Sequence, residues 1–192
     1  MEVLEAIRKR RAIRSFQDRP VDRAVLSTLI AAATQAPSAM NLQPWGFLVV
    51  QGKEAVKRLS DAAKAHLLRT IDPASAVAKY RDELANPAFE LFYGAPALVV
   101  ICAKGAGMTG MIQPNEDCCL AAQDLMLAAL AQGLGSCWIG FSRPWLNQPA
   151  AKRELGVPDD WSPVAPLAIG YPAEAPNPPG RRQPEIVWHP AA

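Results

Sequence analysis

The segment over residues 115–131 is predicted to be a helix, and it is apolar nearly all the way round. Asn115 is placed to cap its N-terminus, Glu116 and Asp117 suit the helix dipole in the first turn, and Gly133 follows its C-terminus. Such a helix needs apolar cover on every side. In a chain of only 192 residues, the simplest source of that cover is a second copy, so the sequence predicts a homodimer.

The rest of the chain predicts an α+β protein that forms one domain over residues 1–192. Helices are expected over residues 2–9, 22–35, 53–69 and 144–155. Strands are expected over residues 46–51, 96–102, 136–141 and 163–170. The run over 96–102 is continuously apolar, which is typical of a central strand.

In three further segments the apolar residues show no regular helical or strand spacing. Residues 72–93 are interrupted by Pro73 and Pro87. Residues 104–114 hold three glycines and two methionines, which indicates a surface loop or lid. Residues 172–192 form an extended arm, because five prolines fall between 172 and 184. The strand-like end of the arm, Glu185–Trp188, is expected to cross to a neighbouring copy.

Composition narrows the class of protein. Half of the residues are hydrophobic, a fifth are charged and the net charge is +2, which is typical of a globular protein. No secretory signal and no apolar stretch of bilayer length occur, so a cytoplasmic protein without membrane contact is expected. The four cysteines lie in apolar runs and predict buried free thiols, and the two histidines are too far apart to favour a metal site.

Cationic side chains gather near both ends of the sequence. Arg8, Lys9, Arg10, Arg11 and Arg14 fall within seven positions, and the pair Arg181–Arg182 lies in the arm. Taken alone, the first group is a solvated helix end, since charge runs are usually surface. A nucleic-acid patch and a phosphate site are the two functional alternatives, because arginine forks match phosphate oxygens in pairs. The arm pair gains meaning only if the arm folds back to meet the first group.

Two loops complete the set of motifs. The segment Pro37–Trp45 (PSAMNLQPW) is rich in turn formers, yet turn chemistry leaves unexplained a tryptophan between Pro44 and a strand. Its functional interpretation is a stiff polar loop that lies along a ligand. The glycines of Gly133–Phe141 (GLGSCWIGF) mark either tight packing or a close approach of backbone amides to a flat ring.

These four motifs, in this order and spacing, resemble the nitroreductase family of FMN-dependent NAD(P)H oxidoreductases. The resemblance covers the whole chain and is most specific in Pro37–Trp45, which is similar to the family pattern Pro-Ser-x-x-Asn-x-Gln-Pro-Trp. It implies a mostly antiparallel sheet of four or five strands flanked by helices. It also implies a homodimer that exchanges its C-terminal arms and holds two flavins at the subunit interface.

The resemblance also implies which residues contact the flavin. Arg10, Arg11 and Ala12 match the phosphate and ribityl side, and Arg14 matches the pyrimidine edge. Ala12 stands where the family usually has serine, so one hydroxyl contact is missing. The other matching residues are Pro37, Ser38, Ala39 and Asn41 from the second subunit, Ile139 and Gly140 at flavin N5, and Arg181 and Arg182 at the phosphate.

The activity that follows is hydride transfer from NAD(P)H to a nitroaromatic, a quinone or a related small acceptor by ping-pong kinetics. The flavin carries the chemistry, so no catalytic side chain is assigned. Met108 and Met111 would contact the acceptor. Three alternatives stay open: a flavin-binding or storage protein with little turnover, a nucleic-acid module, and a relative specialised for dehalogenation, desaturation or flavin fragmentation.

Overall fold

The fold is built around strand β2 (Ala97–Lys104), the central apolar run. The structure, a computed structural model, describes residues 1–105, 113–174 and 176–189. Four strands form one antiparallel sheet in the order β1-β2-β4-β3. The other three strands are β1 (Trp45–Gln51), β3 (Gly135–Trp138) and β4 (Trp161–Gly170).

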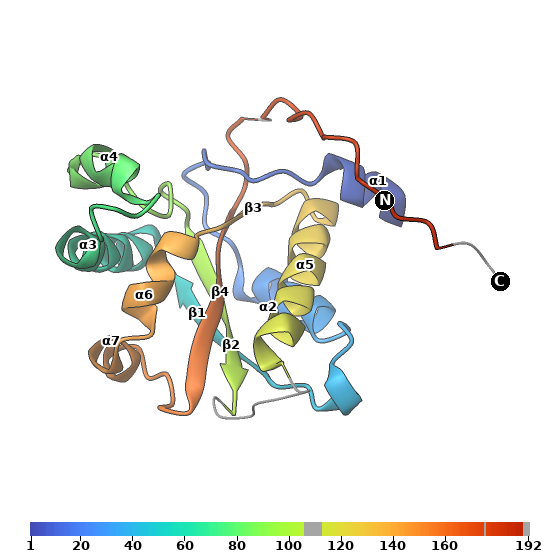
Figure 1. The fold of residues 1–192 in the computed structure, drawn as a ribbon, viewed down its shortest axis with the longest axis horizontal. Coiled ribbons are helices and arrows are strands. Elements are labelled where there is room, and N and C mark those ends of the chain that lie inside the picture. The colour runs from blue at the N-terminus through green and yellow to red at the C-terminus, as the bar shows by residue number, and fades with distance from the viewer. Residues whose placement is uncertain (106–112, 175, 190–192) are drawn as a thin grey trace.

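Helices cover both faces of the sheet, and Figure 1 shows them as two groups on either side of it. One group is α1 (Val3–Lys9), α2 (Arg23–Ala33) and α5 (Pro114–Ala131). The other group is α3 (Lys53–Thr70), α4 (Arg81–Ala85), α6 (Arg143–Leu146) and α7 (Pro149–Glu154). Short 3-10 turns are η1 (Ala39–Asn41), η2 (Ala78–Tyr80) and η3 (Gly140–Ser142).

The two-sided cover explains the continuous apolar sequence of β2. Val99 and Ile101 point into one core with α2 and α5, while Leu98 and Val100 point into a second core with α3 and α6. All four side chains are fully buried. Successive side chains of a strand face opposite sides of the sheet, so a strand between two helical layers has no polar face. The expectation of a central strand in an α+β fold is therefore confirmed.

Several expected boundaries need correction. The N-cap of α5 is Gln113, because Pro114 occupies the first helical position and supplies the fixed backbone angle that favours a helix start. The expected strand over 136–141 ends at Trp138, where the chain enters η3. Within the difficult stretch 72–93, only η2 and α4 are helical.

Two expectations on the arm and the loop have different outcomes. Residues 172–189 form no regular strand among the residues that the structure describes, so the expected strand-like end Glu185–Trp188 pairs with no strand of its own chain. Most of the proposed lid over 104–114, including Met108 and Met111, lies outside the described residues. In the described ranges no helix is both long enough and apolar enough to cross a membrane.

Apolar side chains remain exposed on α1 and α5. Val3, Leu4 and Ile7 are each at least half exposed, although their spacing predicts one inward face. On α5, Leu120 is 46% exposed while Ala121 and Leu125 are fully buried. The chain therefore covers only part of α5, as its nearly uniform apolar sequence implies.

Gly135 gives a direct test of how the N-terminal segment is held on the sheet. A Cβ at this position would lie 2.5 Å from Cγ1 and 2.8 Å from Cβ of Ile13. We expect Gly135→Ala to lower the free energy of unfolding by about 1–3 kcal/mol, because the close contact must open. Urea unfolding measures this change.

Gly180→Ala is the matched control, since a Cβ there would meet nothing within 4 Å. Its free energy of unfolding should equal that of the parent protein. Equal stability of Gly135→Ala and Gly180→Ala would contradict the packing of Ile13 on β3.

Candidate functional site

Residues 12–17 form an extended segment that is fixed to the sheet. Ala12 makes a parallel bridge with Ser136, and the amide of Ile13 donates to the carbonyl of Ser136 at 3.0 Å. Farther on, the amide of Gln17 donates to the carbonyl of Tyr171 at 2.9 Å. These backbone contacts hold the preceding arginines in place at the edge of β3.

The C-terminal arm begins beside the same segment. The amide of Ala173 donates to the carbonyl of Ser15 at 3.0 Å, and Gln17 Nε2 donates to the carbonyl of Pro172 at 2.9 Å. From there the arm passes back along residues 10–14. The two segments enclose a hollow of about 320 Å³, the cationic hollow, lined by Arg10, Arg11, Ala12, Arg14, Pro176, Asn177, Pro179 and Arg181.

The cationic hollow concentrates positive charge, and none of its described lining residues carries a carboxylate. Every ion pair formed between described residues uses a lysine, so Arg10, Arg14 and Arg181 have no acidic partner there. Arg11 Nη1 donates to the main-chain carbonyls of Arg8 and Arg10, at 2.6 and 2.7 Å. Guanidinium groups arranged in this way can bind a phosphate or carboxylate. Arg182, in contrast, does not line the hollow.

A second hollow of about 490 Å³ adjoins the first, and Arg14 lines both. We name it the aromatic hollow. Its other lining residues are Tyr80, Glu83, Leu84, Phe89, Leu91, Tyr93, Cys137, Trp138, Ile139, Gly140 and Phe141.

The rings of the aromatic hollow pack edge to face. Tyr80 and Phe141 have centroids 5.4 Å apart, and Phe89 and Tyr93 have centroids 5.9 Å apart. The guanidinium of Arg14 lies 5.9 Å from the centroid of Tyr93, within the range of a cation–π contact. Burial raises the pKa of the Tyr93 phenol, with the charge of Arg14 opposing the shift, so the hydroxyl remains a neutral donor near pH 7.

Ile139 and Gly140 differ in what their backbones offer. The amide of Ile139 donates to the carbonyl of Pro166 at 2.8 Å and is therefore already used. The amide of Gly140 has no hydrogen-bond acceptor among the described residues, and no atom lies within 4 Å of a Cβ built there. Gly140 therefore offers an open main-chain donor at the aromatic hollow, whereas Ile139 contributes its side chain and its position.

The segment Pro37–Trp45 has an unusual backbone. Met40, Asn41 and Gln43 all have left-handed φ angles, of 50°, 56° and 50°. Ser38 Oγ accepts the amide of Gln43 at 3.0 Å, and Gln43 Nε2 donates to Asn41 Oδ1 at 3.1 Å. A conformation that costs energy at three residues persists because these local bonds hold it.

The segment Pro37–Trp45 does not meet the cationic hollow within one chain. In Figure 1 the turn η1 lies near the end of the sheet opposite the segment that follows α1. Of the expected contact residues, the structure brings together Arg10, Arg11, Ala12, Arg14, Ile139, Gly140 and Arg181. It leaves apart Pro37, Ser38, Ala39 and Asn41, together with Arg182.

The sequence did not point to most of the aromatic hollow. Glu83, Phe89 and Tyr93 lie in the stretch 83–93, whose match to the family pattern was too poor to transfer any flavin contact, and Tyr80 lies just before it. The one available signal was the density of aromatic residues just before the central strand. Asp117 was also missed as an anchor: it is buried and accepts the amide of Ala39 at 3.3 Å.

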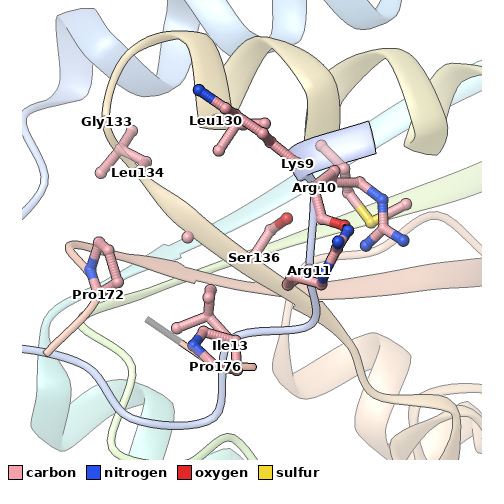
Figure 2. A pocket seen from close by; sticks show the side chains of 12 residues that line it. Lys9, Arg10, Arg11, Ile13, Leu130, Gly133, Leu134, Ser136, Pro172 and Pro176 are labelled. Atoms are coloured by element: carbon pink, nitrogen blue, oxygen red, sulfur yellow. The ribbon is translucent and has the colours of Figure 1, made fainter. Parts of the chain in front are cut away.

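A third hollow of about 230 Å³ shares Arg10 and Arg11 with the cationic hollow. Its wall is mostly apolar and comes from Ile13, from β3 and from the C-terminal end of α5. Figure 2 shows the side chain of Lys9 near Leu130, with the side chains of Arg10 and Arg11 farther from Leu130.

The cysteines do not form a reactive site. Cys102, Cys118 and Cys137 are buried as expected, but Cys119 is exposed on α5 and corrects that expectation. Burial raises the pKa of Cys102 and Cys118 to about 12 and also raises that of Cys137, against the opposing charge of Arg14. A protonated thiol is a poor nucleophile. Within the described chain, no three His, Cys, Asp or Glu side chains gather as a metal site.

Asp117 can be tested as the anchor of the strained loop. We expect Asp117→Ala to speed amide exchange at Ala39 and to lower the free energy of unfolding by about 1 kcal/mol, because the amide loses its acceptor. Hydrogen–deuterium exchange and urea unfolding provide the two measurements. Asp124→Ala on the same helix is the control and should leave exchange at Ala39 unchanged. Equal exchange in both variants would show that Asp117 does not hold the loop.

Comparison with known proteins gives a consistent result. The model of the Nitroreductase family matches residues 7–171. A relative from Methanothermobacter thermautotrophicus named "Putative NADH dehydrogenase/NAD(P)H nitroreductase" is 30% identical over 92% of this chain and 81% of its own length. A 5,6-dimethylbenzimidazole synthase from Rhodospirillum rubrum is 31% identical over 86% of this chain and 79% of its own length.

Solved structures agree with the sequence comparison. A nitroreductase with bound FMN from Bacteroides fragilis superimposes with a TM-score of 0.80 at 26% identity, over 97% of this chain and 99% of that one. A nitroreductase-like protein from Bacillus cereus gives a TM-score of 0.70 at 28% identity, over 97% of this chain and 96% of that one. With its fold and most of its length matched in this way, this chain belongs to the Nitroreductase family.

Proposed function

We propose that this protein is a cytoplasmic, homodimeric, FMN-dependent oxidoreductase with one domain over residues 1–192. It takes hydride from NAD(P)H and passes electrons to a small acceptor such as a nitroaromatic or a quinone. The observation that carries this proposal is the pair of adjoining hollows that share Arg14, one cationic and one aromatic. A ligand with a phosphate at one end and a flat ring at the other matches this pair.

The cationic hollow suits the phosphate. Arg10, Arg11 and Arg181 surround it from both ends of the sequence, and no described carboxylate competes for them. Each charge-assisted hydrogen bond to a phosphate is worth roughly 1.5–3 kcal/mol. Arg182 lies next in sequence and would reach the phosphate only after a change in the arm. The missing hydroxyl at Ala12 leaves the arginines as the main source of affinity.

The aromatic hollow suits the flavin ring. Its aromatic side chains supply apolar surface for the ring, the open amide of Gly140 would donate to N5, and Arg14 would lie at the pyrimidine edge. Bound FMN would supply hydride chemistry at that ring. Arg14 would stabilise the negative charge that reduction brings to the pyrimidine side. No side chain of the hollow is needed as a nucleophile or general base.

The second subunit would complete the site. Pro37, Ser38, Ala39 and Asn41 line neither hollow of their own chain, so another copy would bring them to the site. The exposed apolar residues on α1 and α5 provide a surface for that copy. The exposed end of the arm, Ile186–Trp188, is proposed to cross over in the same dimer.

A flavin storage protein and a specialised relative are the competing functions. Turnover distinguishes a storage protein from the proposed oxidoreductase. A storage protein would hold FMN without oxidising NAD(P)H when a nitroaromatic or a quinone is supplied. The specialised function is favoured by the relatives named 5,6-dimethylbenzimidazole synthase, which are 31% identical to this chain. Release of 5,6-dimethylbenzimidazole from reduced FMN in air would identify that activity. Parallel lines in double-reciprocal plots would support the ping-pong oxidoreductase.

Arg14 is the residue whose removal tests the assignment of the ring. We expect Arg14→Ala to lower the two-electron midpoint potential of bound FMN by about 30–65 mV, because about 1.5–3 kcal/mol of charge stabilisation is lost. Spectroelectrochemical titration measures the potential. Arg58→Ala removes an exposed arginine of α3 and should leave it unchanged. An unaltered potential in Arg14→Ala would contradict the proposed position of the flavin.

Leu120 tests the second subunit. We expect Leu120→Asp to give a monomer that loses its flavin, since a charge in the apolar surface of α5 would prevent association. Analytical ultracentrifugation with absorbance at the flavin band reports both properties. Ala150→Asp places the same charge on α7 and should remain dimeric and yellow. A yellow dimer of Leu120→Asp would remove α5 from the proposed interface.

A further inference from the structure

Helix α3 carries two buried polar side chains on its inner face. Ser60 is fully buried and Lys64 is only 7% exposed, and their spacing of four residues places them one above the other. Buried hydroxyl and ammonium groups are costly unless they are hydrogen-bonded. The partners of these two groups therefore indicate what the helix holds.

Both side chains bind the main chain of residues 86–91. Ser60 Oγ accepts the amide of Leu91 at 2.7 Å. Lys64 Nζ donates to the carbonyls of Asn86 and Phe89, at 3.2 and 2.5 Å. The ion-pair partner of Lys64 is the half-exposed Asp61, at 4.0 Å, which is too long for a strong contact. The ammonium thus serves mainly as a main-chain anchor.

The anchored segment is a wall of the aromatic hollow. Phe89, Leu91 and Tyr93 line that hollow, and residues 86–96 contain no helix or strand that could stiffen them. Tyr93 and Gly94 have left-handed φ angles of 55° and 66°, so the chain turns sharply directly after the anchored part. Because Tyr93 contacts Arg14, the position of the wall also affects the guanidinium at the ring edge.

We propose that Ser60 and Lys64 form a clamp that sets the width of the aromatic hollow. The clamp thereby sets the space left beside the flavin ring and selects the size of the flat aromatic acceptor. This inference rests on the proposed function. Neither residue lines the hollow, so both act as positioning residues through the wall over residues 86–93. A displacement of about 1 Å in such a wall is enough to change the fit of a substrate.

The first experiment measures the wall itself. In the FMN-loaded protein, Ser60→Ala and Lys64→Met should raise the rate of amide exchange over residues 86–93 by about tenfold, because the loss of one hydrogen bond makes opening of the segment easier by about that factor. The exchange rate in β2 should stay the same. Lys57→Met is the matched control on α3, because Lys57 pairs with the half-exposed Asp61 at 2.7 Å. Unchanged exchange over 86–93 in both clamp variants would overturn the proposal.

The second experiment measures selectivity. We expect the clamp variants to change the ratio of KM values for a two-ring quinone and a one-ring quinone at least threefold. The ratio is decisive because any change in the reduction of FMN affects both quinones alike. An unchanged ratio, or an equal loss with both quinones, would overturn the proposed selection of size. If Lys64→Met does not fold, Ser60→Ala decides alone, since it removes a single oxygen.

The two proposals can fail separately. A wild-type protein that binds no FMN or does not turn over contradicts the proposed function, and the exchange measurement then still decides, on the protein as purified, whether α3 holds the wall. A wild-type enzyme that turns over with an unaltered quinone ratio in both variants contradicts only the clamp.

Discussion

The contact between residues 12–13 and β3 is the interaction on which the candidate site depends. The bridge from Ala12 to Ser136 and the packing of Ile13 against Gly135 direct the chain across the sheet edge. Arg10 and Arg14 flank this contact in sequence, so docking one short segment places cations at both hollows. The arm then binds the next part of the same segment and brings Arg181 to the cationic hollow. A flexible N-terminus would scatter these charges in solvent.

The core of the fold followed from sequence patterns. The continuous apolar run of β2 has no polar face because helices cover both sides, and the proline-rich composition of the arm excludes a packed helix. Helix ends were less predictable: Pro114 rather than Asn115 begins α5, since proline at the first helical position competes with a side-chain cap. Local sequence thus specified the elements better than it specified their ends.

The site was predictable only in part. Charge and turn motifs marked Arg10, Arg14 and the loop over 37–45, but the aromatic wall over 86–93 has no periodicity, because anchors on α3 determine its shape. Ser60 and Lys64 are ordinary helix residues in the sequence, and burial alone gives them a role. Similarly, the hydrogen bond from the Ile139 amide to the Pro166 carbonyl could not be predicted locally, because Pro166 lies on a strand distant in sequence.

Native mass spectrometry of the purified protein tests the central claim most directly, because it reports the number of chains and of flavins in one measurement. The proposed site combines Arg10, Arg14 and Arg181 of one chain with the loop over residues 37–41 of another. It therefore predicts an assembly of two chains and two FMN molecules, which loses its flavin when the chains separate. A single chain that carries no flavin after incubation with excess FMN would contradict the account.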